Sequence, residues 1–275
     1  MFDSQKEIPD KVIHPVGVRI IRQFEVAYFA SNSVRIFFEE YGAGSPVVLI
    51  HGFGVDARLQ WGETGLIKFL APHFRVIALD CRGHGRSERF YDPGAYAMRN
   101  MSGDVLNLLD YLQIDRALLV GFSLGSRVCF EIMTTHPERC RAAVLSGFGP
   151  DNATSDAGRR EPLATALLAA DVASITEYQR RIRSAVLEAG NDPSALAACI
   201  RCDTNIPQLS AVTPISVPVL FVKGGKDYVA GDPRGLSDYF RESLVLVIDN
   251  NGHASVVADP RFHTAVADFL AAAPT

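Results

Sequence analysis

The stretch Leu119-Val120-Gly121-Phe122-Ser123-Leu124-Gly125-Ser126 decides the fold prediction, because it places a serine between two glycines. A short apolar run at 116–120 leads into Gly121, and apolar residues from Val128 to Met133 follow Gly125 at helical spacing. Strand, G-x-S-x-G and helix in this order predict a nucleophile elbow, a sharp turn that exposes the serine Oγ. The first amides of the new helix point at the same spot.

Apolar and β-branched segments alternate with helical patterns along the rest of the chain. Strands are predicted near 18–28, 33–41, 46–51, 74–80, 116–121, 141–147, 217–223 and 244–248. Helices are predicted over 60–70, 100–112, 124–136, 233–241 and 260–272. The first two strands carry charged residues in alternation, which is typical of an antiparallel edge, whereas the later strands are apolar throughout. The sequence therefore predicts an α/β fold: a mostly parallel central sheet with antiparallel N-terminal strands and helices on both faces.

The alternation of strands and helices stops between about 150 and 212. This stretch is rich in Ala, Arg and Leu, has helical patterns throughout and contains no predicted strand. Ordinary crossover connections are much shorter. We therefore predict a helical cap at 151–212, inserted into a core made of 1–150 and 213–275, over the sheet edge where α/β proteins bind ligands.

Composition excludes several classes of function. The chain has 275 residues, of which 48% are hydrophobic and 21% charged, and a net charge of −4. Such a chain lacks the basic footprint of a nucleic-acid-binding protein or of one that binds an anionic membrane surface. It has no apolar run of about 18 residues that would span a membrane, and residues 1–18 lack the apolar centre of a secretory signal. The prediction is a cytoplasmic protein with a small-molecule substrate, whose oligomeric state the sequence leaves open.

Five cysteines give no pattern of a disulfide framework or a metal site. They are Cys81, Cys129, Cys140, Cys199 and Cys202. The single C-x-x-C at 199–202 has no second pair, and a zinc site needs four ligands. Reduced thiols are the better interpretation, and no metal is predicted.

A serine nucleophile needs a base to take its proton and a carboxylate to orient that base. The seven histidines are His14, His51, His73, His84, His136, His253 and His263. Of these, His253 alone lies in a short polar loop between the last strand and the last helix. Asp227 follows the strand at 217–223 directly and is the preferred acid. Asp232, Asp249 and Asp151 remain alternatives, the last because it follows another strand end.

The order Ser123, Asp227, His253 is that of the α/β-hydrolase triad. Two further stretches carry the resemblance: His51-Gly52-Phe53-Gly54 is similar to the oxyanion loop of that superfamily, and 80–87, Asp-Cys-Arg-Gly-His-Gly-Arg-Ser, resembles its D-x-R-G-x-G-x-S turn. From about residue 33 onward the chain thus resembles the α/β-hydrolase fold superfamily. The match is specific for fold and much less so for substrate.

The resemblance implies further roles. It assigns the oxyanion hole to the backbone amides of Phe53 and Leu124, and it requires no cofactor. His51 is expected to brace its loop, and the turn at 80–87 is expected to supply supporting residues, namely Asp80, Arg82, His84 and Ser87.

The reaction expected of these groups is a two-step acyl transfer to water. A serine at the elbow excludes the dehalogenase and epoxide-hydrolase chemistry of the superfamily, which needs a carboxylate nucleophile to form an alkyl-enzyme. Carboxylester hydrolysis is the preferred prediction. The main alternatives are hydrolysis of a carbon–carbon bond in a β-diketone-like substrate and a small-molecule receptor with little turnover. Perhydrolase or haloperoxidase-like side activity, lactonase activity and aminopeptidase activity also stay open. Apolar residues near the motifs suggest an apolar acyl group, although each is more typical of core: Phe53, Trp61, Phe122, Leu124 and Phe148.

Overall fold

A computed structural model describes residues 23–150, 157–202 and 215–274. The strands are β1 (Gln23–Ser31), β2 (Val34–Tyr41), β3 (Pro46–Ile50), β4 (Arg75–Leu79), β5 (Ala117–Phe122), β6 (Cys140–Ser146), β7 (Val219–Gly224) and β8 (Ser243–Ile248). They form a single sheet in the order β1-β2-β4-β3-β5-β6-β7-β8. The pairs β1–β2 and β2–β4 are antiparallel, and all others are parallel. This confirms the predicted α/β class with its antiparallel N-terminal strands.

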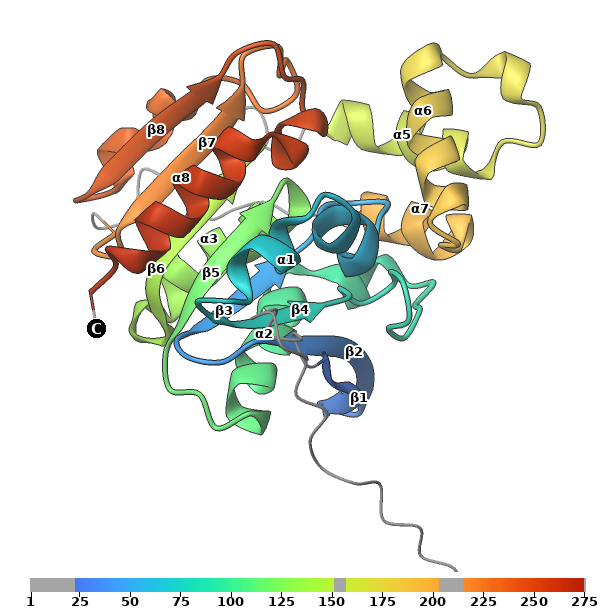
Figure 1. The fold of residues 1–275 in the computed structure, drawn as a ribbon. Helices are drawn as coiled ribbons and strands as arrows, with labels where there is room; N and C mark the ends of the chain where they lie inside the picture. The colour runs from blue at the N-terminus through green and yellow to red at the C-terminus, as the bar shows by residue number, and fades with distance from the viewer. Residues whose placement is uncertain (1–22, 151–156, 203–214, 275) are drawn as a thin grey trace, which may run out of the picture.

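Helices cover both faces of the sheet (Figure 1). The α-helices are α1 (Leu66–Leu70), α2 (Met98–Tyr111), α3 (Leu124–Thr135), α5 (Ala157–Leu168), α6 (Glu177–Glu188), α7 (Pro193–Arg201) and α8 (Pro260–Ala271). The other helical segments are the π-helix η1 (Arg58–Glu63) and the 3₁₀ helices η2 (Pro93–Tyr96), η3 (Pro137–Arg139), η4 (Val172–Ser174), η6 (Pro233–Tyr239) and η7 (Ser255–Ala258). No helix within the described ranges is both long and apolar enough to cross a membrane.

The continuous apolar strands are buried on both faces. In β3, Val48 and Ile50 pack into the core with α2 and α3, whereas Val47 and Leu49 pack into a second core with α1 and α8. Successive side chains of a strand point to opposite faces, so a strand without polar residues needs a cover on each side. The apolar pattern of the sequence follows from this double layer.

Three predicted elements differ from the observed ones. The first strand continues to Ser31, because Asn32 and Ser33 both have positive φ and close a two-residue hairpin of a kind that matches strand twist. The helix predicted over 60–70 is divided, because Gly65 lies between η1 and α1 with φ +90°. The helix predicted over 233–241 is the 3₁₀ helix η6.

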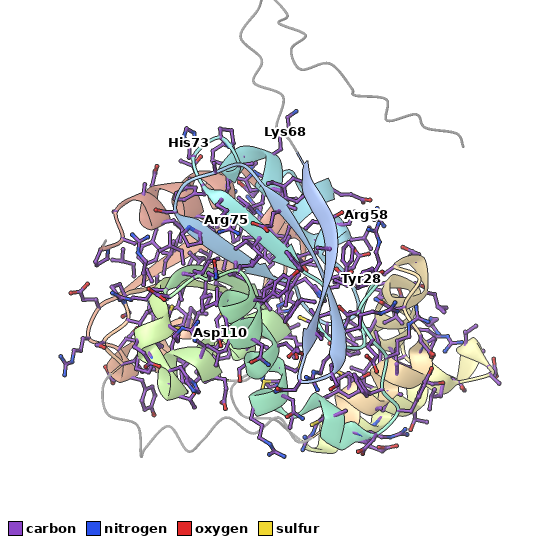
Figure 2. The ribbon with its side chains drawn as sticks, turned by 90° about the horizontal axis from the view of Figure 1, so that it is seen from below. Tyr28, Arg58, Lys68, His73, Arg75 and Asp110 are labelled. Atoms are coloured by element: carbon purple, nitrogen blue, oxygen red, sulfur yellow. The ribbon has the colours of Figure 1, made fainter. Side chains whose placement is uncertain are left out.

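Polar side chains of β1, β2 and β4 make contacts on the antiparallel side of the sheet. Arg75, at the start of β4, pairs with Glu40 of β2 at 2.6 Å, and Arg35 lies over the ring of Tyr28 on β1. Figure 2 labels Arg75 and Tyr28 in the view from below. These contacts support the antiparallel edge of the sheet.

Helices α5, α6 and α7 lie together beyond one end of the sheet (Figure 1). They follow β6 and precede β7 in the chain, as the cap prediction requires. The boundaries at 151 and 212 fall in segments outside the described residues, so the division into core and cap stays a prediction.

Candidate active site

Ser123 occupies a strained turn between β5 and α3. Its φ of 50° and ψ of −105° are unusual for a residue with a side chain. Two glycines permit this turn: a Cβ on Gly125 would lie 2.0 Å from the Ile50 carbonyl oxygen, and one on Gly121 would lie 2.6 Å from the Gly125 backbone. The Ser123 amide donates to the Ser146 carbonyl at 2.8 Å. The strand–turn–helix geometry is that of a nucleophile elbow.

Asp227 and His253 meet although 26 positions separate them in the chain. Asp227 Oδ2 lies 2.8 Å from His253 Nδ1. Its other oxygen, Oδ1, accepts the amides of Val229 and Ala230 at 2.9 Å and 3.2 Å. An ionised carboxylate beside Nδ1 places the ring proton on that nitrogen, which leaves Nε2 able to accept a proton.

The environment of Asp227 keeps its carboxyl ionised. Burial by itself raises the pKa of Asp227, whose side chain is 1% exposed. The hydrogen bond from His253 and the two backbone amides outweigh burial, so the pKa of Asp227 is lowered overall. This carboxylate is therefore available as a fixed negative charge next to the imidazole.

The His253 ring lies against the elbow. Its centroid is 4.9 Å from that of Phe122, the residue before Ser123. A Cβ on Gly147 would lie 2.9 Å from His253 Cε1, and Gly147 follows the residue that accepts the Ser123 amide. Within the described residues no hydrogen bond joins Ser123 Oγ to His253, and such bonds are often long before substrate binds.

The alternative acids have other partners. Asp232 accepts the Arg234 amide at the start of η6 and pairs with the Arg234 side chain. Asp249 is exposed, and Asp151 lies outside the described residues. Among the carboxylates that the structure describes, Asp227 is the one bonded to His253.

The loop after β3 places the Phe53 amide near the same site. His51 Nε2 accepts the Cys81 amide at 2.9 Å, so the ring proton lies on Nδ1, which donates to the Gly52 carbonyl at 2.7 Å. This carbonyl and the Phe53 N–H belong to one planar trans peptide and point in opposite directions. By holding the Gly52 carbonyl, His51 thus orients the Phe53 amide of the same peptide. Burial lowers the pKa of His51, so this imidazole stays neutral.

The second predicted oxyanion donor lies at the start of α3. Leu124 is the first residue of this helix, where backbone amides have no acceptor within the helix. In the part of the chain that the structure describes, neither the Leu124 amide nor the Phe53 amide donates a hydrogen bond to the protein. Both are thus available to a ligand oxygen.

The turn at 80–87 has the supporting geometry expected of it. Asp80 accepts the Ala57 and Arg86 amides, both at 2.9 Å, and thereby joins this turn to the segment after the oxyanion loop. Arg82 forms two hydrogen bonds of 2.7 Å with the buried carboxylate of Asp104 on α2. The sequence interpretation missed Asp104, because its place on a helix contains no signal for a partner 22 positions away.

Of the apolar residues near the motifs, Trp61 and Phe148 are buried in the core at 0% and 2% exposure. Phe53 packs edge-on against the His84 ring, with 5.7 Å between centroids, and Phe122 packs on His253. Within the described ranges the five cysteines are buried and form no disulfide bond. The sequence analysis also missed Asn191, a buried residue between α6 and α7 that contacts the core.

His84 gives a prediction about stability. Burial, together with the neighbouring His51, lowers the pKa of His84 from 6.5 to about 3. Below pH 6.5 His84 binds a proton in the unfolded chain but not in the folded one. The contribution of the neutral His84 side chain to the free energy of unfolding is therefore fully present above pH 6.5 and is lost as the pH falls toward 3.

When the pH falls from 7.5 to 5.5, His84 should therefore lower the unfolding free energy of the wild type by roughly 1 kcal/mol. Urea unfolding of the wild type and of His84→Gln at both pH values measures the difference. On acidification, the unfolding free energy of His84→Gln should fall by about that much less than the unfolding free energy of the wild type. Equal losses in the two proteins would show that His84 is protonated in the fold.

The comparisons with known proteins agree with this fold. The family model for the alpha/beta hydrolase fold matches residues 45–162, which include the oxyanion loop and Ser123 but end before Asp227 and His253. A hydrolase from Pseudomonas aeruginosa PA01 superimposes with a TM-score of 0.73 at 25% identity, covering 90% of this chain and 98% of its own. This chain has the α/β-hydrolase fold.

The sequences that are similar to this chain have different names. A protein of Mycobacterium phage D29, named after non-heme haloperoxidases, is 37% identical over 115 residues, which are 42% of this chain and 40% of that protein. The pimeloyl-[acyl-carrier protein] methyl ester esterase of Pectobacterium carotovorum subsp. carotovorum is 34% identical over 116 residues, 42% of each chain. The chain thus spans less than half of the length of these two relatives. The comparisons support the α/β-hydrolase fold, and they do not by themselves give an activity or a substrate.

Proposed function

We propose that this α/β-hydrolase is a serine carboxylesterase that cleaves small to medium, apolar esters. The observation that carries the proposal is the 2.8 Å hydrogen bond between Asp227 and His253, with the imidazole packed against the elbow that holds Ser123. Similarity to a methyl ester esterase supports the same bond type. Esters also require less than other substrates beyond a nucleophile, a base and an oxyanion hole.

The first half of the reaction forms an acyl-enzyme. His253 Nε2 takes the proton of Ser123 Oγ as the oxygen attacks the ester carbonyl carbon. The carbonyl oxygen becomes an oxyanion, which accepts the amides of Phe53 and Leu124. The tetrahedral intermediate then expels the alcohol oxygen, which takes the proton from His253. Asp227 stabilises the imidazolium during this transfer.

The second half returns the enzyme to its starting state. His253 takes a proton from water as the water oxygen attacks the acyl carbon. The same two amides stabilise the second oxyanion, and collapse of the intermediate returns the proton to Ser123 Oγ and releases the carboxylic acid. Each proton that His253 accepts is passed on in the same half-reaction.

Initial rates on p-nitrophenyl esters from acetate to palmitate test the proposal. We expect multiple turnovers with an optimum at a short to medium acyl chain, together with inactivation by a fluorophosphonate that labels Ser123. Tight ligand binding without turnover would favour the receptor alternative. Turnover on a β-diketone but on no ester would favour carbon–carbon hydrolysis.

A further inference from the structure

Asn191 joins the helices beyond the sheet to two loops of the core. It lies between α6 and α7 and is 4% exposed. Its Oδ1 accepts the Gly85 amide at 2.7 Å, and its Nδ2 donates to the Gly54 carbonyl at 3.0 Å. Because an amide N–H can only donate and a carbonyl can only accept, these partners determine the orientation of the side-chain amide.

The Gly54 carbonyl lies two peptide units after the predicted oxyanion donor, the Phe53 amide. Gly54 follows Phe53 directly and has a φ of +84°. A Cβ there would lie 3.2 Å from Val186 Cγ2 of α6, so this helix covers the residue closely. The Phe53 amide therefore lies between two held carbonyls: Gly52, bonded by His51 from the core, and Gly54, bonded by Asn191.

The bond to Gly85 extends the same connection. Gly85 belongs to the turn whose Asp80 carboxylate accepts the Ala57 amide, three residues after Gly54. A single buried side chain thus bonds to the oxyanion loop and to the turn that supports it. A small displacement of either loop would change the direction of the Phe53 N–H.

We propose that Asn191 is a positioning residue for the oxyanion hole, which aims the Phe53 amide through the Gly54 carbonyl. This inference rests on the proposed function of the Ser123 site. It makes the helices at 157–201 part of the transition-state machinery, in addition to any role in covering substrate. Interactions that strengthen as charge develops on the carbonyl oxygen raise kcat and leave ground-state binding almost unchanged.

Two variants of Asn191 and one control variant test the two hydrogen bonds of its side chain. Asn191→Ala removes both. Asn191→Asp keeps an oxygen for the Gly85 amide, but it loses the donor to Gly54 and places a carboxylate oxygen against that carbonyl. Tyr91→Phe is the matched control, because it removes the 2.8 Å bond from Tyr91 to the adjacent Asp192 and leaves the oxyanion loop untouched.

We expect Asn191→Ala to lower kcat on the best p-nitrophenyl ester roughly 10- to 100-fold, with KM within about twofold of wild type. A trifluoromethyl ketone, which forms a tetrahedral oxyanion on serine, should lose affinity by the same factor as kcat/KM. Asn191→Asp should be as impaired as Asn191→Ala, and Tyr91→Phe should behave like wild type. If Asn191 had a purely structural role, its variants would instead have lower thermal stability, and the loss of trifluoromethyl ketone affinity would not follow the loss of kcat/KM.

Wild-type rates for Asn191→Asp would overturn the proposal, because the Gly54 bond would then be dispensable. So would an effect of Asn191→Ala on KM alone. Hydrogen exchange of the amides in 52–57 and of Gly85 distinguishes failure of this inference from failure of the esterase proposal, since it needs no substrate. Asn191→Ala should lose protection there and Tyr91→Phe should keep it, whereas unchanged protection in Asn191→Ala would overturn the positioning role.

Discussion

Replacing Ser123 with alanine is expected to lower kcat on p-nitrophenyl esters by roughly 10⁵- to 10⁶-fold. Alanine lacks the oxygen that forms the acyl-enzyme, so only the oxyanion amides and substrate binding would still accelerate attack by water. Initial rates of the wild type and of Ser123→Ala on the best ester of the series give this ratio of kcat values. Labelling by a fluorophosphonate should disappear in the same variant.

Folding of this variant needs its own control, because Ser123 has a strained backbone. Alanine keeps the Cβ and hence the strain at φ 50°. Glycine adopts this conformation without steric cost, so Ser123→Gly should be at least as stable as Ser123→Ala and equally inactive. Thermal unfolding compares them. Ester turnover within tenfold of wild type in folded Ser123→Ala would refute the assignment of the nucleophile.

Asp227→Asn should lower kcat about 10⁴-fold while the fold is retained. The variant side chain has the same shape, and its oxygen can still accept the amides of Val229 and Ala230. Its NH₂ group, however, would donate to His253 Nδ1, which moves the ring proton to Nε2. An imidazole with its proton on Nε2 cannot take the proton of Ser123 Oγ.

The pH dependence gives a second test of the same carboxylate. Because the pKa of Asp227 in the fold is lowered from its ordinary value of 3.8, this carboxylate stays ionised throughout the range from pH 5 to pH 9. The profile of kcat/KM for the wild type between pH 5 and 9 should therefore contain no ionisation of Asp227.

Asp232→Asn and Asp249→Asn are matched controls for the loss of one carboxylate. Asp232 caps η6 and Asp249 is exposed, so each variant should retain kcat within about twofold, as surface substitutions away from a site usually do. An equal loss in Asp227→Asn and Asp249→Asn would mean that the acid has been assigned wrongly.

Most of the fold could be predicted because its patterns are local. Strands β3 to β8 coincide with apolar runs to within about two residues, since each run must be covered on both faces of the sheet. The elbow was likewise predictable, because its two glycines are required by backbone contacts within a few residues and with the adjacent strand. The divided helix at 60–70 was not, because an apolar pattern does not reveal that Gly65 adopts a left-handed conformation.

The sequence by itself determined the nucleophile candidate, the order of Ser123, Asp227 and His253, and the double-covered sheet. These follow from short-range patterns whose physical requirements lie within one strand, turn or helix. The tertiary structure decided which carboxylate meets His253, because β7 and β8 lie side by side and bring their following loops together. It also decided that His51 holds the Gly52 carbonyl and that Asn191 holds the Gly54 carbonyl. The Asn191–Gly54 hydrogen bond spans 137 positions, and the His51–Cys81 bond that sets the His51 tautomer spans 30. Such contacts depend on how elements pack, and no local pattern encodes them.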